Sequence, residues 1–167
     1  MIAQRPATAV IPLLDRGSKV IAARDVKKVQ AQARLLGVNM EETVLHELPQ
    51  YYRVDDVNVA VNPVGLSGRK LEIQSLMITI PATVLRNLVK AVNQAGYDVA
   101  RVSYASLAAA GVALTPFHRR QGCLLMDVGS SLTNLLVFKE DQLRYVAVIP
   151  WGGGQVTQGI ADRKSVV

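Results

Sequence analysis

Hydrophobic side chains recur along the chain with two periods, one typical of helices and one typical of strands. Within residues 24–37 they follow steps of three and four, and Gly37 supplies a stop. The helical spacing returns after Pro81, which suits the first turn of a helix, and lasts until Gly96. The pattern therefore predicts two amphipathic helices before residue 100.

Shorter apolar stretches bounded by turn residues predict strands. They cover residues 44–54, 57–61, 71–80, 98–104, 122–128, 132–138 and 143–149. Pro49 indicates an edge or a break in the first of these, because proline cannot donate to a ladder. A helix of small residues, 107–114, ends before Pro116. We expect a compact α+β unit over about residues 20–100, followed by a β-rich region.

The composition indicates a sizeable core and restricts the chemistry. Of the 167 residues 50% are hydrophobic, yet no uninterrupted apolar run is long enough for a membrane-spanning helix. Cys123 is the only cysteine, which excludes an intramolecular disulfide. With only His46 and His118 beside it, a Cys/His zinc site is excluded as well. A reducing, cytoplasmic setting fits these features.

The net charge of +6 is concentrated at the start of the chain, because residues 1–37 carry +5 of it. A basic segment of this kind can contact phosphates of a nucleic acid. Its cations, however, fit the solvent-facing side of the helix predicted over residues 24–37. We therefore expect no nucleic-acid partner.

Candidate chemistry begins at the turn between the first two strands of the β-rich region. Asp127 ends an apolar strand and is followed by a tight turn of Gly129, Ser130 and Ser131. A carboxylate there can hold Mg²⁺ through water, and the turn can offer N–H and hydroxyl donors to a phosphate. The same residues fit an ordinary hairpin in which Asp127 caps its own turn, and the motif alone leaves both interpretations open.

A second glycine-rich turn, Gly152-Gly153-Gly154, lies directly before a helix expected to begin near Gln155. Without side chains, the backbone there can approach a ribose or a phosphate at a helix N-terminus. An ordinary strand-to-helix loop also explains the glycines. The two turns together are more specific than either alone, because one nucleotide could lie between them.

The order of these segments resembles a known family. The stretches GCLLMDVGSSLTNLLVF and VIPWGGGQVTQGIA are similar to the second phosphate-binding segment of the actin, Hsp70 and FtsA ATPase superfamily. The stretches ETVLHELPQYYRVDD, NPVGLSGRKLEI and NLVKAVNQAGYDVARV resemble the strand–helix–strand–strand (SHS2) subdomain inserted in the bacterial cell-division protein FtsA. The resemblance runs from about residue 8 to residue 161 and favours FtsA over the pilus-assembly protein PilM, which stays an alternative.

The resemblance implies a fold of the α+β or α/β class, in which an SHS2-type subdomain precedes an incomplete actin-like (ribonuclease-H-like) sheet. It divides the chain into a residual actin-like segment, an SHS2-like subdomain and a partial ATPase subdomain, at residues 1–19, 20–100 and 101–161. Residues 162–167 break the family pattern and match the translation of a widely used sequencing adapter. We expect them to be an artefact and the chain to be a fragment of a longer protein.

Site residues follow from the resemblance position by position. Asp127 stands at the family's aspartate that holds Mg²⁺ through water, and Gly129, Ser130 and Ser131 stand in the loop that contacts the phosphates of ATP. Gly153 stands where the backbone approaches the ribose. The two serines replace glycines of the family pattern. The resemblance therefore implies that ATP and Mg²⁺ bind the intact protein, and gives less support to binding by the fragment.

Ala105 stands where many superfamily members place the side chain that orients the hydrolytic water. The resemblance thus implies at most a weak ATPase when intact, no catalytic residue and an inactive fragment. It implies an adaptor that tethers FtsZ filaments to the inner face of the membrane at the division septum, through an FtsZ site and a C-terminal membrane helix outside this chain. The SHS2-like subdomain is implied to self-associate and to bind later division proteins. A second hypothesis is that the chain acts only as such an interaction module, without nucleotide.

Overall fold

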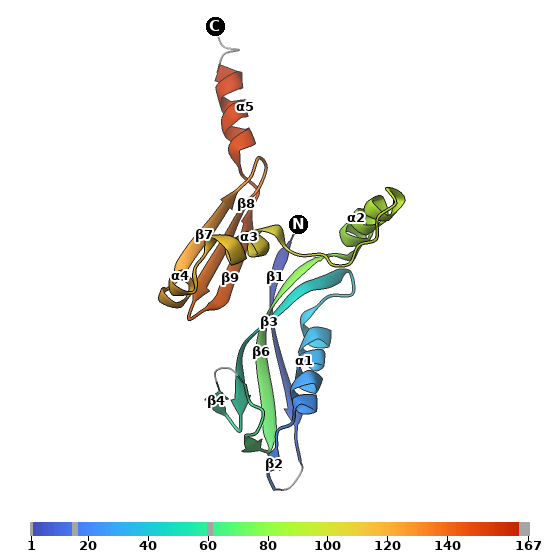
Figure 1. Cartoon of the computed structure of the whole chain (residues 1–167), viewed down its shortest axis with the longest axis vertical. Helices are drawn as coiled ribbons and strands as arrows, with labels where there is room; N and C mark the ends of the chain where they lie inside the picture. The colour runs from blue at the N-terminus through green and yellow to red at the C-terminus, as the bar shows by residue number, and fades with distance from the viewer. Residues whose placement is uncertain (1, 15–16, 60–61, 164–167) are drawn as a thin grey trace. The chain divides into compact units, whose positions relative to one another are not determined.

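The computed structural model describes residues 2–14, 17–59 and 62–163, which form two compact units. The N-terminal unit spans residues 2–102, and the C-terminal unit begins at Ser103. Figure 1 shows the elements of both. None of the helices described is long and apolar enough to cross a membrane.

An antiparallel four-stranded sheet forms the N-terminal unit, with its strands in the order β1-β6-β3-β4. The strands are β1 (Ala3–Pro12), β3 (Glu42–Val54), β4 (Val57–Val59) and β6 (Lys70–Pro81). The central strand is β6, because it pairs along its length with β1 on one side and with β3 on the other. A short ladder joins β2 (Lys19–Val20) to β5 (Ser67–Gly68).

Helix α1 (Ala23–Gly37) covers β1 and β6 on one face of this sheet (Figure 1). Val29 and Ala33 of its apolar stripe are fully buried. They belong to a core with alternate residues of the two strands, namely Ala7, Ala9, Ile11, Leu71, Ile73 and Met77. A Cβ added to Gly37 would lie 2.4 Å from the Cβ of Ala7. The predicted helix is confirmed, and Gly37 allows the helix to approach β1 closely.

The division of the chain differs from the expected limits. Residues 3–12, expected in a separate actin-like segment, form β1 and pair with β6 over ten residues. The two strands are far apart in sequence, so no local pattern of hydrophobic residues shows that they pair. The segment expected to be an artefact, residues 162–167, begins within the last helix, and residues 164–167 lie outside the described residues.

Helix α2 (Ala82–Gln94) follows Pro81 and ends before Gly96, whose φ of 88° favours a glycine, as the sequence predicts. The strand predicted over residues 98–104 is not formed, because none of the segments in the described part of the chain pairs with it. An additional helix, α4 (Pro116–Gln121), begins where the sequence predicts only a helix end. The Thr115 hydroxyl caps α4 by accepting a hydrogen bond from the His118 N–H at 3.3 Å.

The C-terminal unit contains an antiparallel sheet of three consecutive strands, β7 (Cys123–Val128), β8 (Thr133–Lys139) and β9 (Gln142–Ile149). Helices α3 (Ala105–Ala113) and α4 precede the sheet, and α5 (Gly153–Arg163) follows it (Figure 1). Glu140 and Asp141 connect β8 to β9 with φ values of 56° and 59°. Positive φ at both positions is typical of a two-residue hairpin turn, so the predicted hairpin is confirmed.

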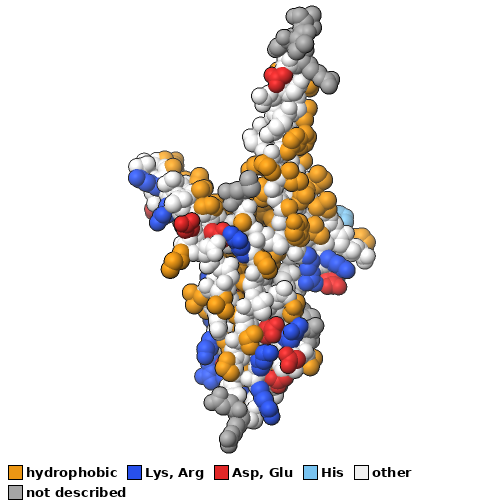
Figure 2. Space-filling model, turned by 180° about the vertical axis from the view of Figure 1, so that it is seen from behind, with side chains coloured by type: hydrophobic (Ala, Val, Ile, Leu, Met, Phe, Trp, Pro, Cys, Tyr) orange, Lys and Arg blue, Asp and Glu red, His pale blue; other side chains and the backbone are white. Residues whose placement is uncertain are grey.

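The two faces of this three-stranded sheet differ in burial. Leu136 and Phe138 of β8 are buried on the face that carries Asp127. The opposite face keeps large hydrophobic side chains exposed, and Figure 2 shows hydrophobic side chains gathered over this unit. We call it the open sheet face, defined by Leu124, Met126, Val128, Tyr145 and Ile149, which are 53%, 58%, 55%, 52% and 42% exposed.

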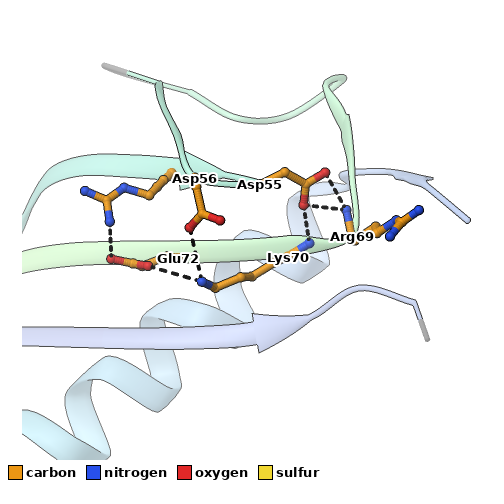
Figure 3. Close-up of polar contacts among 6 residues, drawn as sticks. Asp55, Asp56, Arg69, Lys70 and Glu72 are labelled. Atoms are coloured by element: carbon orange, nitrogen blue, oxygen red, sulfur yellow. Dashed lines mark hydrogen bonds and ion pairs between the residues drawn. The ribbon is translucent and has the colours of Figure 1, made fainter. Parts of the chain in front are cut away.

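A single carboxylate holds the β3–β4 turn against the start of β6 (Figure 3). Asp55 accepts hydrogen bonds from the backbone N–H groups of Arg69, at 2.9 and 3.1 Å, and Lys70, at 2.8 Å. Its neighbour Asp56 makes an exposed ion pair with Lys70 at 3.3 Å. Both aspartates have positive φ, which Asp and Asn tolerate.

We expect Asp55→Asn to lower the free energy of unfolding by about 1–2 kcal/mol, because an amide cannot accept all of these N–H donors. Asp56→Asn is the matched control and should change it by less than about 0.5 kcal/mol, since an exposed ion pair contributes little. Urea denaturation followed by circular dichroism measures both. Equal effects of the two substitutions would contradict a role for Asp55 in fixing the turn.

Two carboxylates of the N-terminal unit are held in their charged form. The Arg5 guanidinium, which donates to Glu42 at 2.7 and 3.2 Å, lowers the pKa of the Glu42 carboxyl. The hydrogen bond from Lys19, at 2.8 Å, and that from the Ala22 N–H, at 3.0 Å, lower the pKa of Asp25. Burial lowers the pKa of His46, so the fold also favours its neutral form.

These shifts predict a fold that is less stable in acid. Stabilisation by a carboxylate whose folded-state pKa is lowered is present above its unfolded pKa of about 4 and is lost as the pH falls through the lowered value. Because burial lowers the pKa of His46, its protonation below about pH 6.5 also costs stability in the folded state. We expect the urea midpoint to decrease from pH 7 to pH 3, and less steeply in Glu42→Gln. Glu41→Gln, at an exposed position, should keep the acid sensitivity of the parent chain; identical behaviour of both variants would contradict the assignment.

Candidate nucleotide-binding turns

Two turns of the C-terminal unit are joined by backbone hydrogen bonds. The first turn, residues 129–132, links β7 to β8, and the second, residues 150–154, leads from β9 into α5. The Gly153 N–H donates to the Gly129 carbonyl at 2.9 Å, and the Gly154 N–H donates to the Ser130 carbonyl at 2.8 Å. The first N–H groups of α5 therefore bind the first turn. We call residues 129–132 and 150–154 the turn pair.

Gly152 lies where the turn pair is most tightly packed. A Cβ there would be 2.4 Å from the Gly129 carbonyl oxygen and 2.6 Å from that of Ser130. At Gly154 the Ser130 oxygen would lie 3.0 Å away, whereas at Gly153 the nearest atom would be 3.9 Å away. Gly152 is thus required by the packing, while Gly153 leaves space beside its Cα.

Asp127 is half-buried at the end of β7 and is held from two directions. The Ser106 hydroxyl of α3 donates to its Oδ2, and the side-chain amide of Asn134 on β8 lies 3.4 Å from the same oxygen. The Tyr104 hydroxyl in turn donates to Asn134 Oδ1 at 2.9 Å. Burial raises the pKa of the Tyr104 phenol, and the negative charge of Asp127 adds to this effect. These contacts fix one carboxylate oxygen, and within the described ranges no hydrogen bond is made to Oδ1.

The first turn and Asp127 suit a phosphate with a hydrated cation. Ser130 and Ser131 are exposed, and their N–H groups make no hydrogen bond to another described residue. Among the residues that the structure describes there is no group of three or more metal-ligating side chains. A single carboxylate matches a Mg²⁺ ion that keeps most of its water and is held by phosphate oxygens, rather than one enclosed by protein ligands.

All five sequence-predicted site residues lie at one end of the β7–β9 sheet, namely Asp127, Gly129, Ser130, Ser131 and Gly153. One expectation does not fit the geometry. The two turns are in direct contact through their backbones, so a nucleotide would lie over the turn pair and not between its turns. The reason is that the short glycine backbone lets α5 begin against the first turn.

Several residues beyond those that the sequence predicts hold this arrangement. Asn134 faces Asp127 in the β7–β8 register, which the length of the turn could have shown. Thr133 donates from its hydroxyl to the Trp151 carbonyl at 2.8 Å and so links β8 to the second turn. Ser106 comes from a helix distant in sequence, and no local signal indicates its contact with Asp127.

The chain is similar to known proteins over most of its length. Residues 3–79 match the family described as the SHS2 domain inserted in FtsA. The cell division protein FtsA of Escherichia coli is 35% identical over 141 residues, which is 84% of this chain and 34% of that protein. The FtsA proteins of Bacillus subtilis and Pseudomonas aeruginosa are 31% identical over 144 residues and 33% identical over 137 residues, with 86% and 82% of this chain covered, and 33% of each relative. Residues 3–79 thus form an SHS2 domain of the kind inserted in FtsA, and the similarity to FtsA proteins extends beyond this domain.

The chain spans about one third of the length of these curated relatives. The SHS2 match includes β1, in agreement with its place in the sheet of the N-terminal unit. In three dimensions the chain resembles a chain of the solved PilM–PilN type IV pilus biogenesis complex, with a TM-score of 0.63 and 18% identity over 99% of this chain and 44% of that one. At this identity the likeness shows the fold alone. The expected fold class, an SHS2 subdomain followed by an actin-like segment, is confirmed.

Proposed function

We propose that the chain is part of an FtsA-type scaffold that joins FtsZ filaments to the inner face of the membrane at the division septum and recruits later division proteins. The observation that carries this proposal is the similarity to cell division protein FtsA, which extends over 141 residues and therefore beyond the SHS2 match at residues 3–79. The fold agrees with it, since an SHS2 domain precedes the turn pair in the chain.

The proposal includes ATP with Mg²⁺ as the ligand of the intact protein. Asp127 would hold the cation through water, and the exposed N–H groups of Ser130 and Ser131 would bind phosphate oxygens. Gly153 leaves space for a ribose. The cation would neutralise phosphate charge when bound. Ala105 cannot orient a water molecule, so the proposed role is binding without rapid hydrolysis.

A chimera tests the scaffold role. The segment of Escherichia coli FtsA that aligns with this chain is replaced by the chain, and native FtsA is depleted. We expect a fluorescent fusion of the chimera to gather at mid-cell and to bind FtsZ. A chimera that is expressed and folded, yet neither gathers at mid-cell nor binds FtsZ, would refute the proposal.

A second candidate function is an interaction module that binds no nucleotide. The engagement of the Gly153 and Gly154 N–H groups with the first turn favours it, because these donors are not available to a phosphate. Calorimetric titration of the chain with ATP and MgCl₂ separates the two, with Asp127→Ala as the variant that should weaken binding about tenfold or more if Asp127 holds the cation. If the titration gives no heat of binding while the chain stays folded and self-associates, the interaction module without nucleotide is the supported function. For a PilM-like role, the structure supplies a fold likeness only.

A further inference from the structure

Helix α1 leaves part of the sheet uncovered. It lies over β1 and β6, so a groove remains between α1 and β3 on the same face. The groove consists of two adjoining hollows of about 520 and 400 Å³, which share Arg34 and Leu35. We call it the α1–β3 groove, defined by Lys27, Arg34, Leu35, Val38, Val44 and Glu47.

The free edge of β3 runs along this groove. Because β4 pairs only with Tyr52, Arg53 and Val54, residues 42–49 have no strand partner, within the described ranges, on the side away from β6. An edge of this kind offers backbone donors and acceptors to an added strand. Pro49 marks the end of this stretch, in agreement with the edge or break that it indicates in the sequence.

One end of the groove is apolar. Leu35 and Met40 are 81% and 104% exposed, and they lie beside Val38 and Val44 in the larger hollow. Such exposed side chains around a concave surface suit the insertion of an apolar side chain of a partner. A flat lipid surface would not fill the hollow.

The other end is cationic. The exposed charged side chains of α1 are all positive, namely Arg24, Lys27, Lys28 and Arg34, but only Lys27 and Arg34 line the groove, and Arg34 is paired with Glu47. Lys27 lines the groove and has no ion-pair partner in the part of the chain that the structure describes.

The floor of the groove contains a polar atom without a partner. The Glu47 side chain is only 9% exposed, and its Oε2 accepts both hydrogen bonds from Arg34, at 2.7 and 3.1 Å. Its Oε1 is buried without a hydrogen bond. Arg34 compensates the charge of Glu47, so the floor of the groove presents no unpaired negative charge to an acidic segment.

We propose that the α1–β3 groove binds an extended, acidic segment of a partner protein as an added strand on β3. The acidic side chain lies at Lys27, and the apolar side chain enters the hollow beside Val38 and Val44. Lys27 and Gly37, the residue before Val38, are about 15 Å apart along α1, a distance that about five extended residues span. This surface is separate from the turn pair, so its test does not depend on nucleotide binding or on FtsZ.

Selection from random dodecapeptides displayed on phage, against the immobilised full chain, tests the proposal. We expect recovered peptides to carry Asp or Glu about five residues from a large apolar side chain. Lys27→Glu should weaken binding of the best peptide about tenfold or more, as expected for reversal of a charge at the contact. Lys28→Glu is the matched control, with the same charge change at the next position and outside the groove, and should change binding less than about twofold. Circular dichroism verifies that both variants are folded.

Recovery of no peptide, or of peptides without acidic residues, would overturn the proposal, as would equal effects of the two substitutions. A third arm uses sedimentation with phosphatidylglycerol vesicles. Binding to vesicles that Lys27→Glu and Lys28→Glu weaken equally, without recovered peptides, would assign the cations of α1 to a membrane surface and reject the groove as a peptide site. When the best peptide is added, hydrogen exchange should show new protection at alternate residues within 42–48, whose N–H groups point away from β6, and lack of this protection would exclude strand addition.

Discussion

Gly152→Ala should destabilise the C-terminal unit by about 2–3 kcal/mol, because a methyl group has no space at the turn pair. Its Cβ would lie 2.4 Å from the carbonyl oxygen of Gly129 and 2.6 Å from that of Ser130. These atoms are backbone and cannot rotate away, so the bonds from Gly153 and Gly154 to the first turn must lengthen or break. The measurement is urea denaturation followed by the fluorescence of Trp151, the only tryptophan, which lies next to the substituted residue.

Gly159→Ala provides the matched control within α5. No atom lies within 4 Å of the Cβ that it would introduce. Alanine in the interior of an exposed helix should raise stability by up to about 1 kcal/mol relative to glycine. Equal stability of the two variants, with unchanged Trp151 fluorescence, would show that the turns are not in contact as described.

Self-association of the chain through the open sheet face is the second large effect that we expect. Leu124, Met126 and Val128 are each more than half exposed on one face of β7, and an apolar patch of this kind on a soluble domain promotes association. The double substitution Leu124→Thr with Met126→Thr should shift the chain towards monomer in sedimentation velocity, because it replaces apolar contact area without removing β-forming residues.

Val112→Thr is the control for this experiment, since Val112 is 92% exposed on α3 but lies outside the open sheet face. It should leave the distribution of species unchanged. A parent chain that sediments as a single monomeric species at micromolar concentration would contradict the prediction. The prediction would also be contradicted if the double substitution and Val112→Thr reduced association equally.

Except for α4, the helices and the three consecutive strands could be predicted because their signals are local. The periodic stripe of Val29 and Ala33 is sufficient to define α1, and the polar turn at Glu140 and Asp141 is sufficient to define the β8–β9 hairpin. Pairing between β1 and β6 depends on residues distant in sequence. The alternation of apolar residues within residues 3–12 does not indicate which strand pairs with this segment. The missing strand over residues 98–104 has the same cause, since an extended segment becomes a strand only beside another strand.

The candidate site shows the same limit at the level of single residues. Asp127, Gly129, Ser130 and Ser131 follow each other in the chain, so their proximity could be predicted. The three consecutive glycines of the second turn look equivalent in the sequence, and only the packing distances show that Gly152 is the one without space for a side chain. Whether these residues bind ATP stays a prediction for the titration to decide.

The bonds between the first turn and the start of α5 also make the two mechanically dependent. A displacement of the Gly129 or Ser130 carbonyl pulls on the N–H groups of Gly153 and Gly154, which belong to the first turn of the helix. With 11 residues, α5 is about 16 Å long, so a small rotation at its base moves its far end by several ångströms. The orientation of α5 therefore depends on the conformation of the four-residue turn, residues 129–132.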